Sequence, residues 1–141
     1  MSVQEILAVK GNNVVTASAD DSVADVAAML AENKIGALVV IEGDAVTGIA
    51  SERDLIRAVH KNGAAALAEP VRNFMTSKVV SCKPSDTIDQ LMEMMTAGRF
   101  RHLPVLDDGK LVGIVSIGDV VKRKIEQAER DAEDLKRYIA G

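Results

Sequence analysis

Aromatic side chains are scarce in this sequence, and tryptophan is absent. Phe74, Phe100 and Tyr138 are the only aromatic residues among 141, although 48% of the residues are hydrophobic. The core must therefore be aliphatic, and the chain is long enough for about one domain. A strongly basic balance is also lacking, since the formal net charge is −4. Without basic segments or stacking aromatics, we expect no general nucleic-acid binding.

Cysteine, histidine and long apolar runs are equally rare. The single cysteine, Cys82, permits no internal disulfide, as in a reducing cytoplasm, and we expect it to pack as a small apolar residue, with a redox role as the alternative. His60 and His102 have no partners at metal-ligand spacing, so we expect no metal site. The longest aliphatic run, at 37–41, is far too short to span a membrane. We therefore expect a cytoplasmic protein that does not bind membranes.

What the sequence does contain is one phrase written twice. GIASERDLI occupies 48–56 and GIVSIGDVV occupies 113–121, and both read Gly-Ile-x-Ser-x-x-Asp followed by two aliphatic residues. With an offset of 65, residues 14–58 align with 79–123 without a gap, and ten of the 45 positions are identical. Two copies are too few for a solenoid, so the repetition predicts a pseudo-twofold pair.

Each copy has the same order of predicted elements. A short strand comes first, VVTA at 14–17 or VVSC at 79–82. A helix follows over 23–33 or 88–98, where apolar residues recur at helical spacing. Both helices are preceded by a Ser or Thr that resembles the start of a capping box.

A β-hairpin and a second helix complete each copy. ALVVI turns at EGDA into VTGIA, and LPVL turns at DDGK into LVGIV, with glycine and aspartate supplying the turn chemistry. The second helix begins just after Ser51 or Ser116. The prediction is thus an α+β fold in which two pseudo-twofold-related β-α-β-β-α repeats form one compact module.

The last helix is predicted to extend beyond the second repeat, from about Gly118 towards Ala140. Its apolar residues form a heptad stripe that must fold onto the module or pack against a second chain. The stripe consists of Val121, Ile125, Ala128, Ala132, Leu135 and Ile139. We expect repeat 1 with its lead-in over 1–63, a linker and second lead-in over 64–78, repeat 2 over 79–127, and a helical extension over 128–141.

These two copies resemble a tandem cystathionine-β-synthase (CBS) domain pair, also called a Bateman module. The resemblance covers roughly residues 3–127, and the phrase RHLPV-x(4)-LVGIVS-x-x-D is among its more specific parts. It implies a stand-alone regulatory sensor that binds adenosine-containing nucleotides in clefts between the repeats. AMP, ADP, ATP and a dinucleotide such as NAD are the ligands to expect.

The repeated Ser-x-x-Asp has two interpretations, which are compatible. Ser51 and Ser116 can cap their helices, with Asp54 and Asp119 at the positive helix end. The same helix start is also an anion site, where the hydroxyl can contact a phosphate and the carboxylate can accept from a ribose diol. The resemblance assigns the second pair of roles, the hydroxyl near phosphate and the carboxylate on ribose.

A second cluster of polar residues lies in GRFRHLPV at 98–105. Arg99, Arg101 and His102 can simply complement a helix C-terminus and a strand edge. They can also bind phosphate, because charge-assisted bonds from arginine are strong, and the resemblance places phosphate contacts here. Alternation along a strand means that Arg101 and His102 need not reach the same ligand.

The two copies differ in charge. Opposite Arg101 and His102 stand Gly36 and Ala37, while Arg53 has Gly118 as its counterpart. In the CBS family a cleft combines the Ser-x-x-Asp of one repeat with residues at the start of the hairpin of the other. By that logic, one cleft holds Ser51, Arg53 and Asp54 with Arg101 and His102. The other holds Ser116 and Asp119 with Gly36 and Ala37.

This second cleft is expected to be roomier and poorer in positive charge. It would hold a neutral nucleoside, the second half of a dinucleotide, or nothing. The base pocket should be apolar, although core packing is the alternative for each of its candidates. These are Val15, Thr16, Ile35, Val80, Ser81, Phe100 and Pro104.

For function, the sequence favours a non-enzymatic nucleotide sensor over an enzyme. Asp54, Asp119 and His102 are too few acid and base groups to define a reaction, so no catalytic residue and no catalytic cofactor are expected. The alternative is a structural dimerisation module with empty clefts. We expect a homodimer to which the C-terminal helix contributes, and a regulated partner protein that the sequence does not identify.

Overall fold

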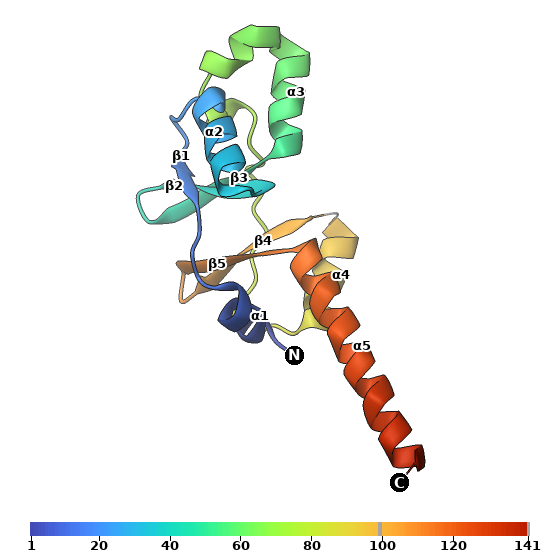
Figure 1. Cartoon of the computed structure of the whole chain (residues 1–141). Helices are drawn as coiled ribbons and strands as arrows, with labels where there is room; N and C mark the ends of the chain where they lie inside the picture. The colour runs from blue at the N-terminus through green and yellow to red at the C-terminus, as the bar shows by residue number, and fades with distance from the viewer. Residues whose placement is uncertain (99, 141) are drawn as a thin grey trace.

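The computed structural model describes residues 1–98 and 100–140 and confirms the α+β pair of repeats (Figure 1). Repeat 1 comprises β1 (Thr16–Ser18), α2 (Val23–Asn33), β2 (Ala37–Glu42), β3 (Ala45–Ser51) and α3 (Glu52–Asn62). Repeat 2 comprises α4 (Ile88–Gly98), β4 (His102–Asp107), β5 (Lys110–Ser116) and α5 (Ile117–Ala140). An N-terminal helix α1 (Val3–Lys10) precedes them, and two 3₁₀ helices, η1 (Gly63–Ala68) and η2 (Val71–Asn73), lie within the expected linker.

The two hairpins are built alike. β2 pairs with β3, and β4 with β5, in antiparallel ladders whose register shifts at Val40/Ile41 and at Val105/Leu106, which are equivalent positions under the 65-residue offset. The second hairpin turns at Asp108 and Gly109, both with positive φ, as a type I′ turn requires. The repeat thus extends to the register shift of the ladders, whereas the turns differ, since only Gly43 has a positive φ in the turn of the first hairpin.

The strand expected at 79–82 is wrong, because only an isolated bridge between Cys82 and Val105 forms there. In repeat 1, β1 lies parallel to β2, and the Val39 N–H donates to the Val15 carbonyl at 3.3 Å. The residue equivalent to Val39 is Pro104, which has no N–H to donate to Val80. The second sheet therefore keeps two strands, while the first has three.

The predicted helix starts are confirmed. The Ser22 hydroxyl accepts from the Asp25 N–H at 3.1 Å, at the start of α2. Thr87 and Gln90 form a reciprocal capping box, with the two hydrogen bonds at 2.8 and 3.1 Å. The C-terminal helix also runs over the expected range, as α5 from Ile117 to Ala140.

The helix α1, which the sequence did not predict, packs against repeat 2 and not against repeat 1, which follows it in the chain. Its Val3, Ile6 and Leu7 lie in the hydrophobic core of repeat 2, although they precede repeat 1 in the chain. Conversely, Val71 and the neighbouring Met75, which precede repeat 2, pack in the core of repeat 1. The chain thereby crosses between the two halves twice, and neither core is complete without a segment from the other end.

The glycine that opens each repeated phrase is explained by this exchange. A Cβ on Gly113 would lie 2.6 Å from Cδ2 of Leu7, and one on Gly48 would lie 2.5 Å from Sδ of Met75. Real Cβ atoms do not approach so closely, so a side chain at either position would force the side chain of Leu7 or Met75 to shift. Gly48 and Gly113 therefore mark where each lead-in passes over the opposite repeat.

The distal part of α5 projects away from the module (Figure 1). Leu135 and Ile139 of the heptad stripe are 59% and 76% exposed, so this part of the stripe is not covered by its own chain. Within residues 1–98 and 100–140, the structure has no helix that is both long and apolar enough to cross a membrane.

Gly113→Ala should destabilise the fold by about 1–3 kcal/mol, because the added methyl group overpacks against buried Leu7. Gly118→Ala is the matched control, since its Cβ would meet only ordinary contacts in the first turn of α5. Urea denaturation should show a lower midpoint for the first variant and an unchanged or slightly higher one for the second. Equal midpoints for both variants would contradict the close approach.

Candidate functional site

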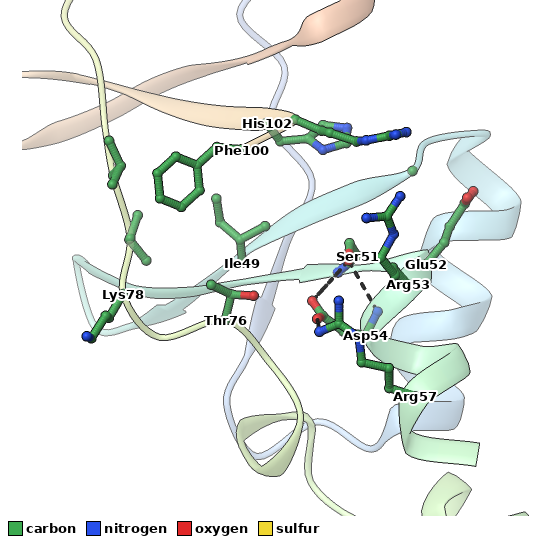
Figure 2. Close-up of a pocket in the computed structure, with 14 residues that line it drawn as sticks. Ile49, Ser51, Glu52, Arg53, Asp54, Arg57, Thr76, Lys78, Phe100 and His102 are labelled. Carbon is green, nitrogen blue, oxygen red and sulfur yellow. Dashed lines mark hydrogen bonds and ion pairs between the residues drawn. The ribbon is translucent and has the colours of Figure 1, made fainter. Parts of the chain in front are cut away.

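A pocket of about 280 Å³ lies between the two repeats, near the lower end of the range for small-molecule sites (Figure 2). Its walls come from β3 and α3, from the segment after η2, and from the start of β4 with the residues beside it. The lining residues are Gly36, Ile49, Ser51, Glu52, Arg53, Asp54, Arg57, Thr76, Lys78, Val79, Val80, Phe100, Arg101 and His102. The structure thus brings Ser51, Arg53 and Asp54 together with Arg101 and His102, as the cleft assignment from the sequence expected.

The first Ser-x-x-Asp forms a capping box at the start of α3. The Asp54 N–H donates to the Ser51 hydroxyl at 3.2 Å, and Oδ2 of Asp54 accepts from the Ser51 N–H at 2.9 Å and from its hydroxyl at 3.0 Å. Oδ1 faces the Arg57 guanidinium, at 3.6 Å (Figure 2). The helix-capping and the ligand-binding interpretations are therefore compatible, because one carboxylate oxygen caps the helix while the other lies in the wall of the pocket.

The pocket carries more positive than negative charge. Four permanent cations line it, Arg53, Arg57, Lys78 and Arg101, against the two carboxylates of Glu52 and Asp54. This excess stands out in a chain whose net charge is −4. The cations come from both repeats and from the linker, so an anion placed among them would be held by all three parts of the chain.

His102 lies where the two halves of the module meet. A Cβ built on Gly36 of repeat 1 would lie 3.8 Å from Nε2 of His102 and 3.8 Å from Cδ of Glu52. Burial lowers the pKa of His102 below 6.5, aided by the positive charges of Lys10 and Arg101 and opposed by the carboxylates of Asp119 and Glu52. The imidazole is therefore neutral at pH 7 without a bound anion, and it can take up a proton when one binds.

The second Ser-x-x-Asp is arranged differently. Its capping contacts are the same, with Ser116 N–H to Asp119 Oδ2 at 2.9 Å and Asp119 N–H to the Ser116 hydroxyl at 3.2 Å. Asp119 Oδ2, however, also accepts from Nζ of Lys10 at 2.6 Å. The expectation that this cleft is poor in positive charge is wrong, because α1 places an ammonium group directly on its carboxylate.

The pKa of Asp119 reflects this contact. Burial acts to raise it, but the hydrogen bond and charge of Lys10, together with the hydrogen bonds from Ser116, outweigh burial and hold it below its usual value. Asp119 is therefore a carboxylate that already has a strong cationic partner within the chain.

The apolar candidates from the sequence divide into two groups. Val80 and Phe100 line the pocket. Ile35 lines a separate depression between α2 and α3, with Leu30 and Leu55 among its neighbours. The described lining of the first pocket does not include Val15, Thr16, Ser81, Pro104, Ser116 or Asp119. Arg99, the third cation expected in this cluster, lies outside the described residues.

Sequence reasoning missed six of the residues that line the pocket. They are Ile49, Glu52, Arg57, Thr76, Lys78 and Val79. Gly36, which was expected in the other cleft, also lines this pocket. A signal for Lys78 exists in the lead-ins, where VQEIL at 3–7 matches VRNFM at 71–75 with an offset of 68. That offset makes Lys78 the counterpart of Lys10, so both lysines belong to a Ser-x-x-Asp site.

Cys82 lies in the core of repeat 2 and is only 2% exposed, as a small apolar residue would be. Burial, together with the negative charge of Asp86, raises the pKa of its thiol to about 12. A thiol that stays protonated is a poor nucleophile, so the redox alternative has no support in its surroundings.

The fold and the site define a class of protein, a tandem pair of β-α-β-β-α repeats with a cationic pocket between them. The CBS domain model matches residues 3–61 and 71–126, and the chain belongs to the CBS domain family. It is 35% identical over 127 residues to a mitochondrial CBS domain-containing protein, CBSX3, of Arabidopsis thaliana. That match covers 86% of this chain and 62% of the plant protein.

Solved structures agree with the assignment. A CBS-domain-containing protein from Agrobacterium tumefaciens is 50% identical, with a TM-score of 0.85 over 88% of this chain and 99% of its own. The CBSX2 protein, solved in complex with AMP, is 27% identical, with a TM-score of 0.71 over 84% of this chain and 92% of its own. The expected resemblance to a CBS pair is thereby confirmed.

Acidification should destabilise the protein partly through His102. Because its pKa is lowered by folding, the unfolded chain takes up the proton first, so stability present above pH 6.5 is lost as the pH falls through the folded pKa. His102→Gln should therefore show a smaller loss of unfolding free energy between pH 7.5 and 5.5 than the parent does. Urea titrations at both pH values measure this loss, and parallel losses in parent and variant would contradict the account.

Proposed function

We propose that this chain is a non-catalytic regulatory sensor that binds an adenosine nucleotide in the pocket between its repeats. The observation that carries the proposal is the composition of the pocket, in which Ser51 and Asp54 of repeat 1 face Arg101 and His102 of repeat 2. Ligand binding there would connect the two halves, and a change in their arrangement is what a regulatory module needs to transmit.

Each part of a nucleotide has a matching surface in the pocket. Oδ1 of Asp54, which lies 3.6 Å from the Arg57 guanidinium, can accept from a ribose diol, while Oδ2 remains in the helix cap. Arg53, Arg101 and the proton-accepting His102 suit a phosphate. Val80 and Phe100 provide the apolar wall that a purine requires.

The excess of cations favours a phosphorylated ligand over a neutral nucleoside. AMP, ADP and ATP therefore rank above adenosine in the proposal, and the AMP complex of CBSX2 supports this choice of ligand class. NAD is ranked lower, because its second half would need the cleft of Asp119, whose carboxylate is already paired with Lys10.

A homodimer forms the second part of the proposal. The exposed stripe on α5, with Leu135 and Ile139, is the kind of surface that a second copy would cover. A regulated partner protein would then read the ligand-dependent arrangement of the dimer. The alternative function, a structural dimerisation module with empty clefts, uses the same stripe and needs no ligand.

Nucleotide binding should stabilise the fold and depend on Asp54 and Arg101. At about 100 times its dissociation constant, AMP should add roughly 2.7 kcal/mol to the unfolding free energy. Asp54→Ala should weaken AMP binding about ten- to a hundredfold, since it removes a hydrogen-bonding charged group worth roughly 1.5–3 kcal/mol. Arg101→Ala should weaken AMP far more than adenosine, because its partner is the phosphate. Calorimetric titration measures all three effects.

The cap role of Asp54 requires a control. Apo Asp54→Ala should be compared with Gln90→Ala, since the Gln90 side chain makes the same capping-box contact at the start of α4 but lies outside the pocket. An unchanged melting temperature with AMP, ADP, ATP and NAD at millimolar concentrations would reject the nucleotide proposal and leave the structural module. Equal losses for AMP and adenosine in Arg101→Ala would reject the phosphate contact.

The α5 stripe should mediate self-association. Leu135→Asp with Ile139→Asp places charges on the exposed stripe and should weaken the dimer, while AMP affinity changes little because the stripe lies beyond the pocket. Lys136→Asp with Glu129→Lys, which alters exposed charges off the stripe, is the matched control. Light scattering should give a lower mass only for the first variant. The same mass for it and the parent would exclude this interface.

A further inference from the structure

Lys10, the last residue of α1, forms hydrogen bonds to the second repeated phrase through its ammonium group. Its Nζ donates to Oδ2 of Asp119 at 2.6 Å and to the carbonyl of Ile114 at 2.9 Å. The ammonium group thus satisfies both a carboxylate and a backbone acceptor of the second repeated phrase. The carboxylate is one quarter exposed, so the contact is partly shielded from water.

In the first repeat, the equivalent carboxylate and backbone carbonyl have other partners. The carbonyl of Ile49, equivalent to Ile114, accepts from the Thr76 N–H at 2.9 Å, and the chain then bends at Lys78. Lys78 lines the open pocket and forms no ion pair among the described residues. A backbone bridge therefore replaces the lysine of the second repeat, and the partner of the Asp54 carboxylate is the Arg57 guanidinium, 3.6 Å from Oδ1, rather than a lysine of the lead-in.

The local sequence explains the difference between the two lysines. Val14 lies four positions after Lys10, and Gly11 ends α1. Val79, in contrast, directly follows Lys78. The extra residues let the lead-in to repeat 1 stay helical through Lys10 and direct its last side chain onto Asp119. The lead-in to repeat 2 instead forms a bridge from Thr76 to Ile49.

We propose that Lys10 acts as a built-in occupant of the second Ser-x-x-Asp cleft, so that the module binds one nucleotide per chain and gains a second nucleoside site only when Lys10 is withdrawn. This inference rests on the proposed function for the meaning of the first site. A ribose diol that binds Oδ2 of Asp119 has to displace an ammonium group that makes two hydrogen bonds, and one that approaches Oδ1 meets the same ammonium group beside it. The site that opens would take an uncharged nucleoside, since Gly36 and Ala37 stand where the first site has Arg101 and His102.

The test compares the parent with Lys10→Met, which keeps the length of the side chain and removes its charge. Calorimetric titration with adenosine and with AMP should give one site per chain for the parent and two adenosine sites for Lys10→Met. Adding Asp119→Asn to Lys10→Met should return the number to one. Lys61→Met, which removes an exposed lysine of α3 that lines none of these clefts, should behave as the parent does.

Two results would overturn the inference. They are a parent that binds two nucleotides per chain, and a well-folded Lys10→Met that still binds only one. If Lys10→Met is unstable, Lys10→Gln replaces it, because the amide can still donate to the Ile114 carbonyl without a charge. NMR titration of the Asp119 carboxyl should also show a higher pKa in either variant.

The same data separate this inference from the proposed function. A parent that binds no nucleotide rejects the sensor proposal. If Lys10→Met then gains one adenosine site that Asp119→Asn removes, the role of Lys10 stands by itself. If no site appears in Lys10→Met, the role of Lys10 is rejected too.

Discussion

The close approach of a lead-in segment to a glycine, once in each repeat, is the contact on which the rest of the structure depends. Leu7 passes over Gly113 and Met75 passes over Gly48, and neither crossing leaves room for a Cβ atom. Each repeat has its own core, but because a crossing segment from elsewhere in the chain contributes to it, neither core is complete from its repeat alone. The pocket between the repeats is a consequence, since its walls come from segments that the crossings hold together.

The two crossings also make the sites unequal. Both Ser-x-x-Asp motifs cap a helix with the same hydrogen bonds, so the local backbone does not distinguish them. The difference comes from the side chains that each lead-in segment places beside the motif. The segment after η2 contributes Thr76 and Lys78 to the wall of the pocket, whereas α1 contributes Lys10, which neutralises Asp119. A duplicated sequence thereby produces one open cationic pocket and one carboxylate that is already occupied.

Much of this arrangement could be predicted from the sequence, because a repeated sequence predicts a repeated structure. The 65-residue offset gave the hairpins, the helices and the pairing of Ser51 and Asp54 with Arg101 and His102. It failed where a single residue changed the backbone chemistry, as at Pro104, which removes the N–H that a third strand in repeat 2 would need. The same offset also failed to predict α1 and the role of Lys10. The lead-in segments match with an offset of 68 and not 65, so an alignment of the repeats does not pair Lys10 with Lys78.

The central claim is that an adenosine nucleotide binds between the repeats at the first Ser-x-x-Asp. The most direct measurement is a two-dimensional amide NMR titration of the protein with AMP, which reports the site without any mutation. The account predicts that the largest chemical-shift changes occur at residues 51–54, 76–80 and 100–102, which lie far apart in the sequence and together line the pocket. Changes confined to residues 116–119 and 10–14, or no change at millimolar AMP, would contradict it.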